Sequence, residues 1–376
     1  MALNTVSSDR LSTNVKTSNL GTELIKKVGQ DKNILHNGSF IVHQRGGTTT
    51  SPGFLLDRWY SAMNGGTATF SQGTETSGTV YEKGLVNYCR ITNTANSTVS
   101  SAYRYLRQAI EAQNLLKSGW NYKSASAKIT LSFYVRSSVA QNFYGYLRLS
   151  DSPDSRYTFE TGSLTADTWT KVTKVIPGYA SGNIDNDNGS GMEVLIAPFW
   201  GTDGTDSGVT LNTWAAFNGG QRFPDYATTW AGTNGATFDV TGVQLEVGSV
   251  ATDFEHRSFA QELALCQRYY YQFVDGDTQF VGIGHSFSSS EIDVPITFQT
   301  AMRAAPSLNQ TTGGNYFGVL GGGDSTAYVD GSWTIFAPTE YGCWIYATPD
   351  ASITAGNTKL VRSTNASARL AFTAEL

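Results

Sequence analysis

The sequence has few charged residues and no long apolar run, and each lack excludes a class of protein. None of its segments approaches the ~18 consecutive apolar residues of a membrane-spanning helix, so we expect no membrane insertion. Charged residues make up 15% of the 376 residues, and the net charge is −5. Because a sequence-independent nucleic-acid binder is normally basic, we expect no nucleic-acid partner. The first residues, MALNTVSSDRLSTNV, also lack the pattern of a secretory signal, which we therefore do not expect.

The chain also lacks the common signatures of catalytic and metal sites. Its three cysteines, Cys89, Cys266 and Cys343, are far apart, so we expect buried or free thiols rather than a zinc site. No HExxH, GxSxG, P-loop or GxGxxG motif is present. The sequence thus predicts a protein that is not an enzyme and has no cofactor. Structural calcium stays open as an alternative, with Asp239 as the candidate ligand because it follows a strand-like stretch.

Residues 34–257 show the pattern of a β-sandwich. In KITLSFYVRSS the apolar residues Ile129, Leu131, Phe133 and Val135 alternate with more polar ones, as on a half-buried strand. Similar stretches recur between turn clusters such as DNDNGSG and GTDGTDSG. Many short strands with such turns predict a jelly-roll sandwich. One exception is LRQAIEAQNLLKSGW, residues 106–120, whose apolar spacing predicts a helix that stops near Gly119.

The chain changes character near residue 258. SFAQ forms a capping box in which Ser258 caps the helix and Gln261 bonds back, so we expect a connector helix over residues 258–271. Strand patterns return over residues 272–376 and predict a second, smaller β-sandwich domain. Residues that we expect to pack at a domain or subunit interface are Phe259, Leu263, Cys266, Tyr269 and Tyr270.

Residues 1–33 have no aromatic residue or proline and cannot form a core of their own. We expect an extended or helical N-terminal arm whose apolar stripe comprises Leu24, Ile25 and Val28. A disordered tail and an arm that orders on a larger assembly are both compatible with this composition. The predicted fold class is therefore all-β, with a jelly roll, a short connector helix, a second β-domain and this arm.

Tyrosines and arginines on predicted outward strand faces are candidates for binding sugars. Aromatic rings stack on the C–H faces of sugars, while guanidinium groups bond their hydroxyls. Tryptophans and tyrosines in loop-like segments are further candidates. The same tyrosines could instead lie under a loop or at an oligomer interface. The candidate residues are Tyr134, Arg136, Tyr144, Tyr146, Arg148, Trp200, Tyr226 and Trp230.

Several motifs resemble bacteriophage tail-fibre and minor virion structural proteins. NGSFIVHQRGG followed by FLLDRWY, residues 37–60, resembles their opening, and GTDSGVTLNTWAAF, Gly204–Phe217, resembles one of their loops. The most characteristic match is GATFDVTGVQLEVGSVATDFEHRSFAQELALCQRYY. The resemblance covers residues 35–272. His43 stands where the family has Trp, and Asp253 where it has Pro.

The resemblance implies a carbohydrate-binding-module-like jelly roll in a virion appendage. The protein would be made in the host cytoplasm, dock to other phage tail or virion proteins through residues 1–33 and form a homotrimer. Its β-domains would bind host cell-surface polysaccharide, with residues 272–376 as the fibre tip. The alternative is a capsid decoration or tail-connector protein without glycan binding. A depolymerase is a third interpretation, disfavoured by the lack of a β-helix repeat.

Overall fold

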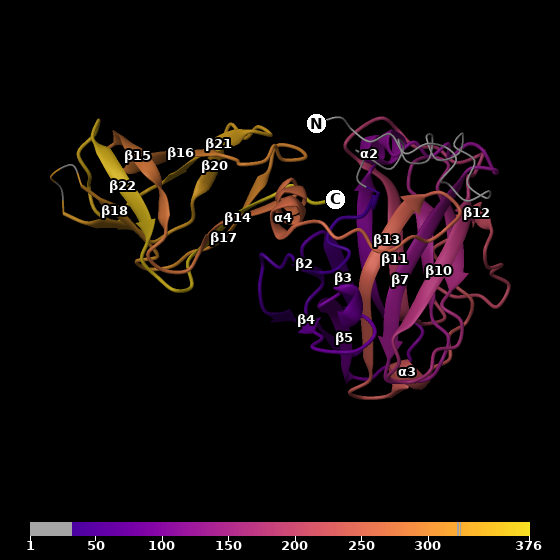
Figure 1. Ribbon diagram of the computed structural model, residues 1–376. Coiled ribbons are helices and arrows are strands. Elements are labelled where there is room, and N and C mark those ends of the chain that lie inside the picture. The colour runs from indigo at the N-terminus through magenta and orange to yellow at the C-terminus, as the bar shows by residue number, and fades with distance from the viewer. Residues whose placement is uncertain (1–31, 322, 324) are drawn as a thin grey trace, which may run out of the picture.

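Two antiparallel sheets pack face to face over residues 48–247 and form a jelly-roll sandwich (Figure 1). The computed structural model describes residues 32–321, 323 and 325–376, so the predicted arm residues Leu24, Ile25 and Val28 lie outside the described chain. Neighbouring strands such as β5 and β13 are far apart in sequence, as jelly-roll connections require. The first sheet contains, in order, β1 (Thr48–Thr49), β4 (Thr67–Thr74), β5 (Asn87–Ala95), β13 (Thr237–Val247), β7 (Lys128–Ser137) and β10 (Thr170–Pro177).

The second sheet of this sandwich has seven strands, and the core lies between the two sheets. Ile129, Leu131, Phe133 and Val135 are fully buried there as predicted, but Thr130, Ser132 and Tyr134 on the other face of β7 are buried too, so the strand is not half-buried. The ring of Phe133 meets that of Phe159 from the opposite sheet, with centroids 6.2 Å apart. The second sheet contains β12 (Trp214–Ala216), β9 (Ser155–Glu160), β8 (Tyr144–Leu149), β11 (Ser190–Trp200), β6 (Tyr103–Glu111), β3 (Trp59–Asn64) and β2 (Gly53–Leu56).

The predicted helix over residues 106–120 is largely wrong. Strand β6 continues to Glu111, and only α2 (Ala112–Lys117) is helical. Leu106 and Ile110 face the core, and β6 pairs with β3 on one side and β11 on the other. These two ladders outweigh the helix-favouring residues, because tertiary context overrides weak local preference. The sandwich also contains the short helices η2 (Tyr81–Lys83) and α3 (Thr229–Gly232).

A second core lies in the C-terminal part of the chain, where a three-stranded and a seven-stranded sheet meet. Its buried residues include Val294 and Phe372. The all-β fold class predicted from the sequence is confirmed. The smaller sheet contains β14 (Tyr270–Asp275), β23 (Arg369–Thr373) and β17 (Ser307–Thr311). The larger sheet contains β19 (Ala327–Val329), β18 (Phe317–Leu320), β22 (Thr358–Ser363), β15 (Phe280–Ser288), β16 (Glu291–Thr297), β21 (Gly342–Ala347) and β20 (Thr334–Phe336).

Helix α4 (Phe259–Gln267) lies between the two sandwiches (Figure 1). The predicted capping box is confirmed, since the Ser258 hydroxyl accepts from the Gln261 backbone and the Gln261 side chain bonds back. The helix is shorter than expected, because it ends at Gln267 and β14 begins three residues later. Phe259 is 57% exposed, so it does not pack at the contact between the two sandwiches, and its predicted place at a subunit interface stays a prediction.

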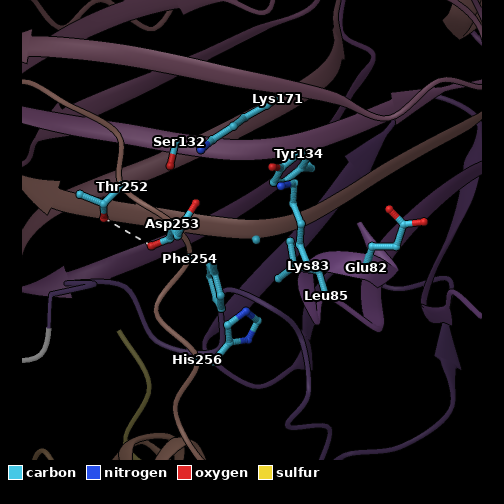
Figure 2. A pocket seen from close by; sticks show the side chains of 11 residues that line it. Glu82, Lys83, Leu85, Ser132, Tyr134, Lys171, Thr252, Asp253, Phe254 and His256 are labelled. Carbon is cyan, nitrogen blue, oxygen red and sulfur yellow. Dashed lines mark hydrogen bonds between the residues drawn. The ribbon is translucent and has the colours of Figure 1, made fainter. Parts of the chain in front are cut away.

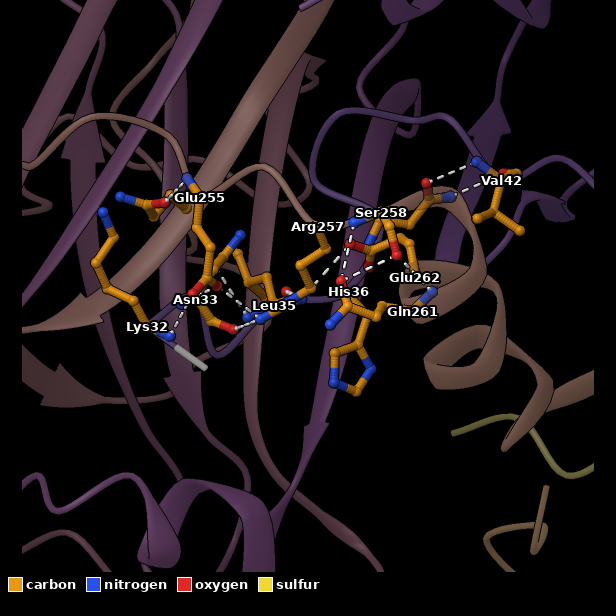
Figure 3. Close-up of polar contacts among 12 residues, drawn as sticks. Lys32, Asn33, Leu35, His36, Val42, Glu255, Arg257, Ser258, Gln261 and Glu262 are labelled. Atoms are coloured by element: carbon orange, nitrogen blue, oxygen red, sulfur yellow. Dashed lines mark hydrogen bonds and ion pairs between the residues drawn. The ribbon is translucent and has the colours of Figure 1, made fainter. Parts of the chain in front are cut away.

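Helix α4 and the segment just before it anchor the first described residues. The Glu255 carboxylate accepts hydrogen bonds from the backbone N–H groups of Lys32 and Asn33, both at 2.9 Å (Figure 3). The carboxylate of Glu262 on α4 accepts from the backbone N–H of Asn37. Residues 32–37 are therefore tied to the segment that links the sandwiches.

Candidate functional site

An aromatic surface lies on the outer face of the second sheet. Tyr103 and Tyr105 alternate with core residues along β6, so both rings point away from the core. Trp200, at the end of β11, stacks against both, with ring centroids 4.9 Å from Tyr103 and 5.5 Å from Tyr105. The planes of Tyr105 and Trp200 differ by only 11°. The two tyrosines are half-buried, so part of each ring faces solvent.

Guanidinium groups flank this aromatic surface. Arg107 lies 5.2 Å from the ring centre of Tyr60, its partner on β3. On the other side, the Arg222 guanidinium lies 4.7 Å from the Trp200 ring. We call the set Tyr60, Tyr103, Tyr105, Arg107, Trp200 and Arg222 the aromatic surface. It offers ring faces for C–H groups next to hydrogen-bond donors for hydroxyls.

Glu193 connects Arg107 of the aromatic surface to Arg148 on the neighbouring part of the sheet. Arg107 and Arg148 both pair with Glu193, and Arg148 also bonds Asp154 at 2.8 and 2.6 Å. Burial raises the pKa of Tyr105 to about 12, so its hydroxyl stays protonated at neutral pH and can donate a hydrogen bond. The surface therefore places neutral aromatic rings beside positively charged hydrogen-bond donors and negatively charged acceptors.

The predicted glycan residues do not form one site. Tyr134 and Arg136 lie on the first sheet, whereas Tyr144, Tyr146 and Arg148 lie on the second. The expectation that Tyr146 is exposed is wrong, because it is 3% exposed and stacks at 5.5 Å against Phe223 from the covering loop. For Tyr146 the structure therefore shows the alternative stated in the sequence analysis, in which a tyrosine lies under a loop.

Two loop aromatics are also packed rather than exposed. The hydroxyl of Tyr226 donates to the Ala197 carbonyl at 3.1 Å, and the residue is 9% exposed. Trp230 is fully buried and donates its indole N–H to the Thr237 carbonyl at 2.9 Å. Both therefore belong to the packing of the sandwich, since a buried indole or phenol normally bonds a backbone group. Trp200, the remaining predicted loop residue, lies at the end of β11 and is also only 9% exposed, but its ring stacks directly on Tyr103 and Tyr105 and so forms the base of the aromatic surface.

Asp239, the candidate calcium ligand, is occupied by two arginines. Its oxygens accept from Arg90 at 2.8 Å and from Arg136 at 2.8 and 2.9 Å. Two adjacent cations disfavour a third positive charge at this carboxylate. Within the described residues, no group of three or more His, Cys, Asp or Glu side chains could hold a metal ion. The described part of the chain also contains no helix that is long and apolar enough to span a membrane.

Tyr269 and Tyr270 lie in the contact between the two sandwiches. The Arg58 guanidinium is 3.3 Å from the Tyr269 ring centre, and Arg45 is 3.5 Å from that of Tyr270. Cys266 is fully buried, and Cys89 and Cys343 are nearly so. All three thiols are free, as expected. Because Cys266, Tyr269 and Tyr270 are buried within one chain, they offer no surface to a second copy. Leu263 is only partly buried.

A broad apolar face is exposed on the larger C-terminal sheet. Trp344 stacks on Phe336 with centroids 5.9 Å apart, and Ile283 is paired with Leu360 on the neighbouring strand. Core residues such as Val294 and Ile345 occupy the alternate positions and face the other way. We call Ile283, Phe287, Phe336, Trp344 and Leu360, each 40–67% exposed, the apolar face. Monomeric soluble proteins rarely expose so many large apolar side chains together.

The aromatic surface contains residues that the sequence analysis did not select. Tyr103, Tyr105 and Arg107 belong to YRYLRQ, where a period of two was visible. That signal was hidden by the helical spacing of the residues that follow. Tyr60 and Arg222 lie elsewhere in the sequence, and only the fold brings them beside this strand.

Comparisons with known proteins identify distant structural likeness only. No protein-family model matches the chain, and no curated protein matches it. Tailspike protein 4 of bacteriophage CBA120 aligns at 10% identity and a TM-score of 0.32, over 57% of this chain and 21% of the tailspike chain. A putative sugar-binding protein from Bacteroides thetaiotaomicron aligns at 13% identity and a TM-score of 0.31, over 58% and 100%. A family 61 carbohydrate-binding module in complex with β-1,4-galactotriose aligns at 10% identity and a TM-score of 0.29, over 58% and 100%. At such scores the likeness has no bearing on which ligand this chain binds.

Proposed function

We propose that the protein is a non-enzymatic glycan-binding structural protein of a phage virion appendage, a tail fibre or fibre tip. The observation that carries glycan binding is the stack of Tyr103, Trp200 and Tyr105 on an outer sheet face, flanked by Arg107 and Arg222. The partly exposed rings of Tyr103 and Tyr105, backed by the 9% exposed Trp200 and flanked by charged hydrogen-bond donors, match the two needs of sugar recognition. The virion role rests on the sequence resemblance alone, with residues 1–33 as the docking arm and host surface polysaccharide as the ligand.

Binding to host cells and to their purified polysaccharide tests this proposal. Tyr105→Ala removes a ring of the stack and should weaken binding at least tenfold. Tyr328→Ala, on the edge strand β19 far along the chain from the aromatic surface, is the matched control and should bind normally. If the wild-type protein binds neither the cells nor the polysaccharide, or if both variants behave alike, glycan binding through this surface is refuted.

Self-association is the second part of the proposal, and the apolar face supports it. An aromatic side chain buries about 150–250 Å² when it is fully covered. Three of the five side chains are aromatic and each is about half exposed, so their rings supply on the order of 300 Å² of apolar area, to which Ile283 and Leu360 add. A standard interface buries roughly 800 Å² per partner. We infer that copies of the chain meet through this face, with a homotrimer as the expected assembly.

The alternative is a capsid decoration or tail-connector protein without glycan binding. The apolar face favours this alternative as much as it favours a fibre, because either role needs contacts with other virion proteins. Electron microscopy of particles with the protein labelled distinguishes the two. A position on the tail supports the fibre, whereas a position on the capsid overturns it.

A further inference from the structure

A pocket of about 300 Å³ lies on the outer face of the first sheet, which is the opposite sheet from the one that carries the aromatic surface. Ser132 and Tyr134 from β7 and Lys171 from β10 line it on the sheet side. Lys83 from η2 and residues 252–256 form its other walls (Figure 2). Side chains from at least four segments of the chain therefore line one small space.

A backbone irregularity in β13 makes room for this pocket. The pairing of β13 with β7 shifts register between Thr241 and Gln244, and Gly242 between them has φ +60°. A Cβ at Gly242 would lie 2.7 Å from the Leu85 side chain and 3.3 Å from that of Tyr134. Only glycine suits both the backbone and the space. Bulges of this kind are frequent beside functional sites.

Two buried hydroxyl groups end in the pocket without a protein partner. Ser132 is 3% exposed and Tyr134 is 8% exposed. Within the described chain neither hydroxyl makes a hydrogen bond, and neither oxygen is sealed from solvent. Burial raises the pKa of Tyr134, and the nearby Asp253 charge adds to the effect, so the phenol stays protonated. Because each oxygen opens into the pocket without a protein partner, each hydroxyl is available to bond a ligand.

The charged groups around the pocket are also unpaired. Among the described residues, the ammonium groups of Lys83 and Lys171 have no ion-pair or hydrogen-bond partner, and neither do the carboxylates of Glu82 and Asp253. The ammonium group of Lys171 lies 6.0 Å from the Tyr134 ring centre. Two cations and two anions around one small pocket suit a ligand that carries an anion together with several hydroxyls.

We propose that this pocket binds one carboxylated sugar residue. Lys171 and the hydroxyls of Ser132 and Tyr134 hold the carboxylate, because charge-assisted hydrogen bonds to an anion are the strongest available here. Asp253 accepts from ring hydroxyls, and Phe254 covers a C–H face of the ring. The inference rests on the proposed function and names an acidic component of the glycan at a second site.

Titration with D-glucuronate, followed by calorimetry or protein NMR, tests the site. The wild-type protein should bind glucuronate, and Lys171→Ala should lower the affinity at least tenfold. Tyr134→Phe keeps the ring and removes only the hydroxyl, so it should fold normally and lose affinity several-fold. Lys117→Ala, an exposed lysine on α2, is the control and should bind as the wild type does. D-Glucose and acetate should each bind at least tenfold more weakly than glucuronate.

The outcomes separate this inference from the proposed function. No glucuronate binding, or equal binding by Lys171→Ala, overturns the pocket. Equal affinity for acetate shows a simple anion site, and equal affinity for glucose shows a neutral-sugar site; each overturns the carboxylated sugar. Tyr105→Ala should keep full glucuronate affinity while it loses host polysaccharide. If Tyr105→Ala loses host binding and the wild type ignores glucuronate, the proposed function stands and this inference fails.

Discussion

The carboxylate of Glu375 lies 2.6 Å from the guanidinium of Arg58, although the two residues belong to different sandwiches. The exposed fractions of the two side chains are 8% and 1%, so water screens this pair little. Arg58 also donates to the Ala109 carbonyl at 2.6 Å. The contact between the sandwiches is therefore built around a buried, hydrogen-bonded ion pair.

Glu375→Ala should loosen the contact between the sandwiches. It leaves the Arg58 charge buried without its carboxylate, and breaking such a pair costs about 3–5 kcal/mol. Thermal unfolding should show a lower midpoint, and limited proteolysis near residues 257–270 should be faster. The control is Asp275→Ala, which breaks an exposed pair with Arg369 and should cost less than about 1 kcal/mol. Equal effects of the two changes would contradict the structural role of the buried pair.

The contribution of Glu111 should depend on pH. Burial alone would raise the pKa of Glu111, but hydrogen bonds from Arg268 and Tyr269 outweigh burial and hold this pKa below the ordinary 4.5. Since the folded pKa is the lower one, the stabilisation is complete above about pH 4.5 and is lost as the pH falls through the folded pKa. Glu111→Gln should therefore destabilise strongly at neutral pH and progressively less below pH 4.5. Denaturant unfolding of both proteins from pH 3 to 7 checks this, and a difference that is independent of pH would refute it.

Substitutions at Trp230 and Tyr105 should have opposite effects, the first lowering mainly the stability and the second mainly the glycan affinity. Trp230→Phe removes the indole N–H that donates to the Thr237 carbonyl, which keeps its hydrogen bond from the Ser138 backbone N–H, and losing one such bond costs about 0.5–1.5 kcal/mol. The folded fraction of this variant should bind host polysaccharide with unchanged affinity. Tyr105→Ala should show the reverse, with a small loss of stability and a large loss of binding. Denaturant melts together with binding isotherms measure both quantities, and a loss of affinity in Trp230→Phe would place Trp230 in the site after all.

Replacing the apolar face should change the assembly. Trp344→Ser combined with Phe287→Ser removes two exposed aromatics, 53% and 67% exposed, from the sheet surface without touching its core. We expect a shift to monomer in sedimentation or light scattering. Val250→Ser, a single exposed apolar residue elsewhere, is the control and should assemble as the wild type does. A monomeric wild-type protein would remove the basis for self-association through this face.

Alternation and turn chemistry predicted the fold class because those signals are local. The period-two pattern around Phe133 and the capping box at Ser258 each lie within a few residues, and both are present in the structure. The helix prediction was wrong at Leu106. The apolar spacing there fits a helix and a strand equally, and pairing with β3 and β11 makes this segment a strand. Periodicity alone cannot distinguish such short apolar runs.

The candidate site depended on information that no single stretch contains. Outward orientation of Tyr146 was predicted correctly from alternation, but the loop that brings Phe223 over it was not visible in that pattern. Likewise, Trp200 meets Tyr103 and Tyr105 only because β11 lies beside β6. The pocket at Tyr134 depends on a register shift at Gly242, which sequence alone marks only as a glycine within a strand. The sequence therefore identified side chains that could bind a sugar, but it did not predict which of them lie next to each other in the fold.

The turn at Asn188 has a mechanical consequence. Asn188 and Arg303 exchange hydrogen bonds between the sandwiches, at 2.8 Å from the amide and 2.9 Å from the guanidinium. Together with the pairs Glu375–Arg58 and Glu111–Arg268, this contact lies beside the covalent connection through α4. A force that pulls the two sandwiches apart therefore loads these contacts in parallel with those of Arg45 to Glu375 and Gln44 to the Tyr270 carbonyl, and all must break before the connection through α4 alone bears the force.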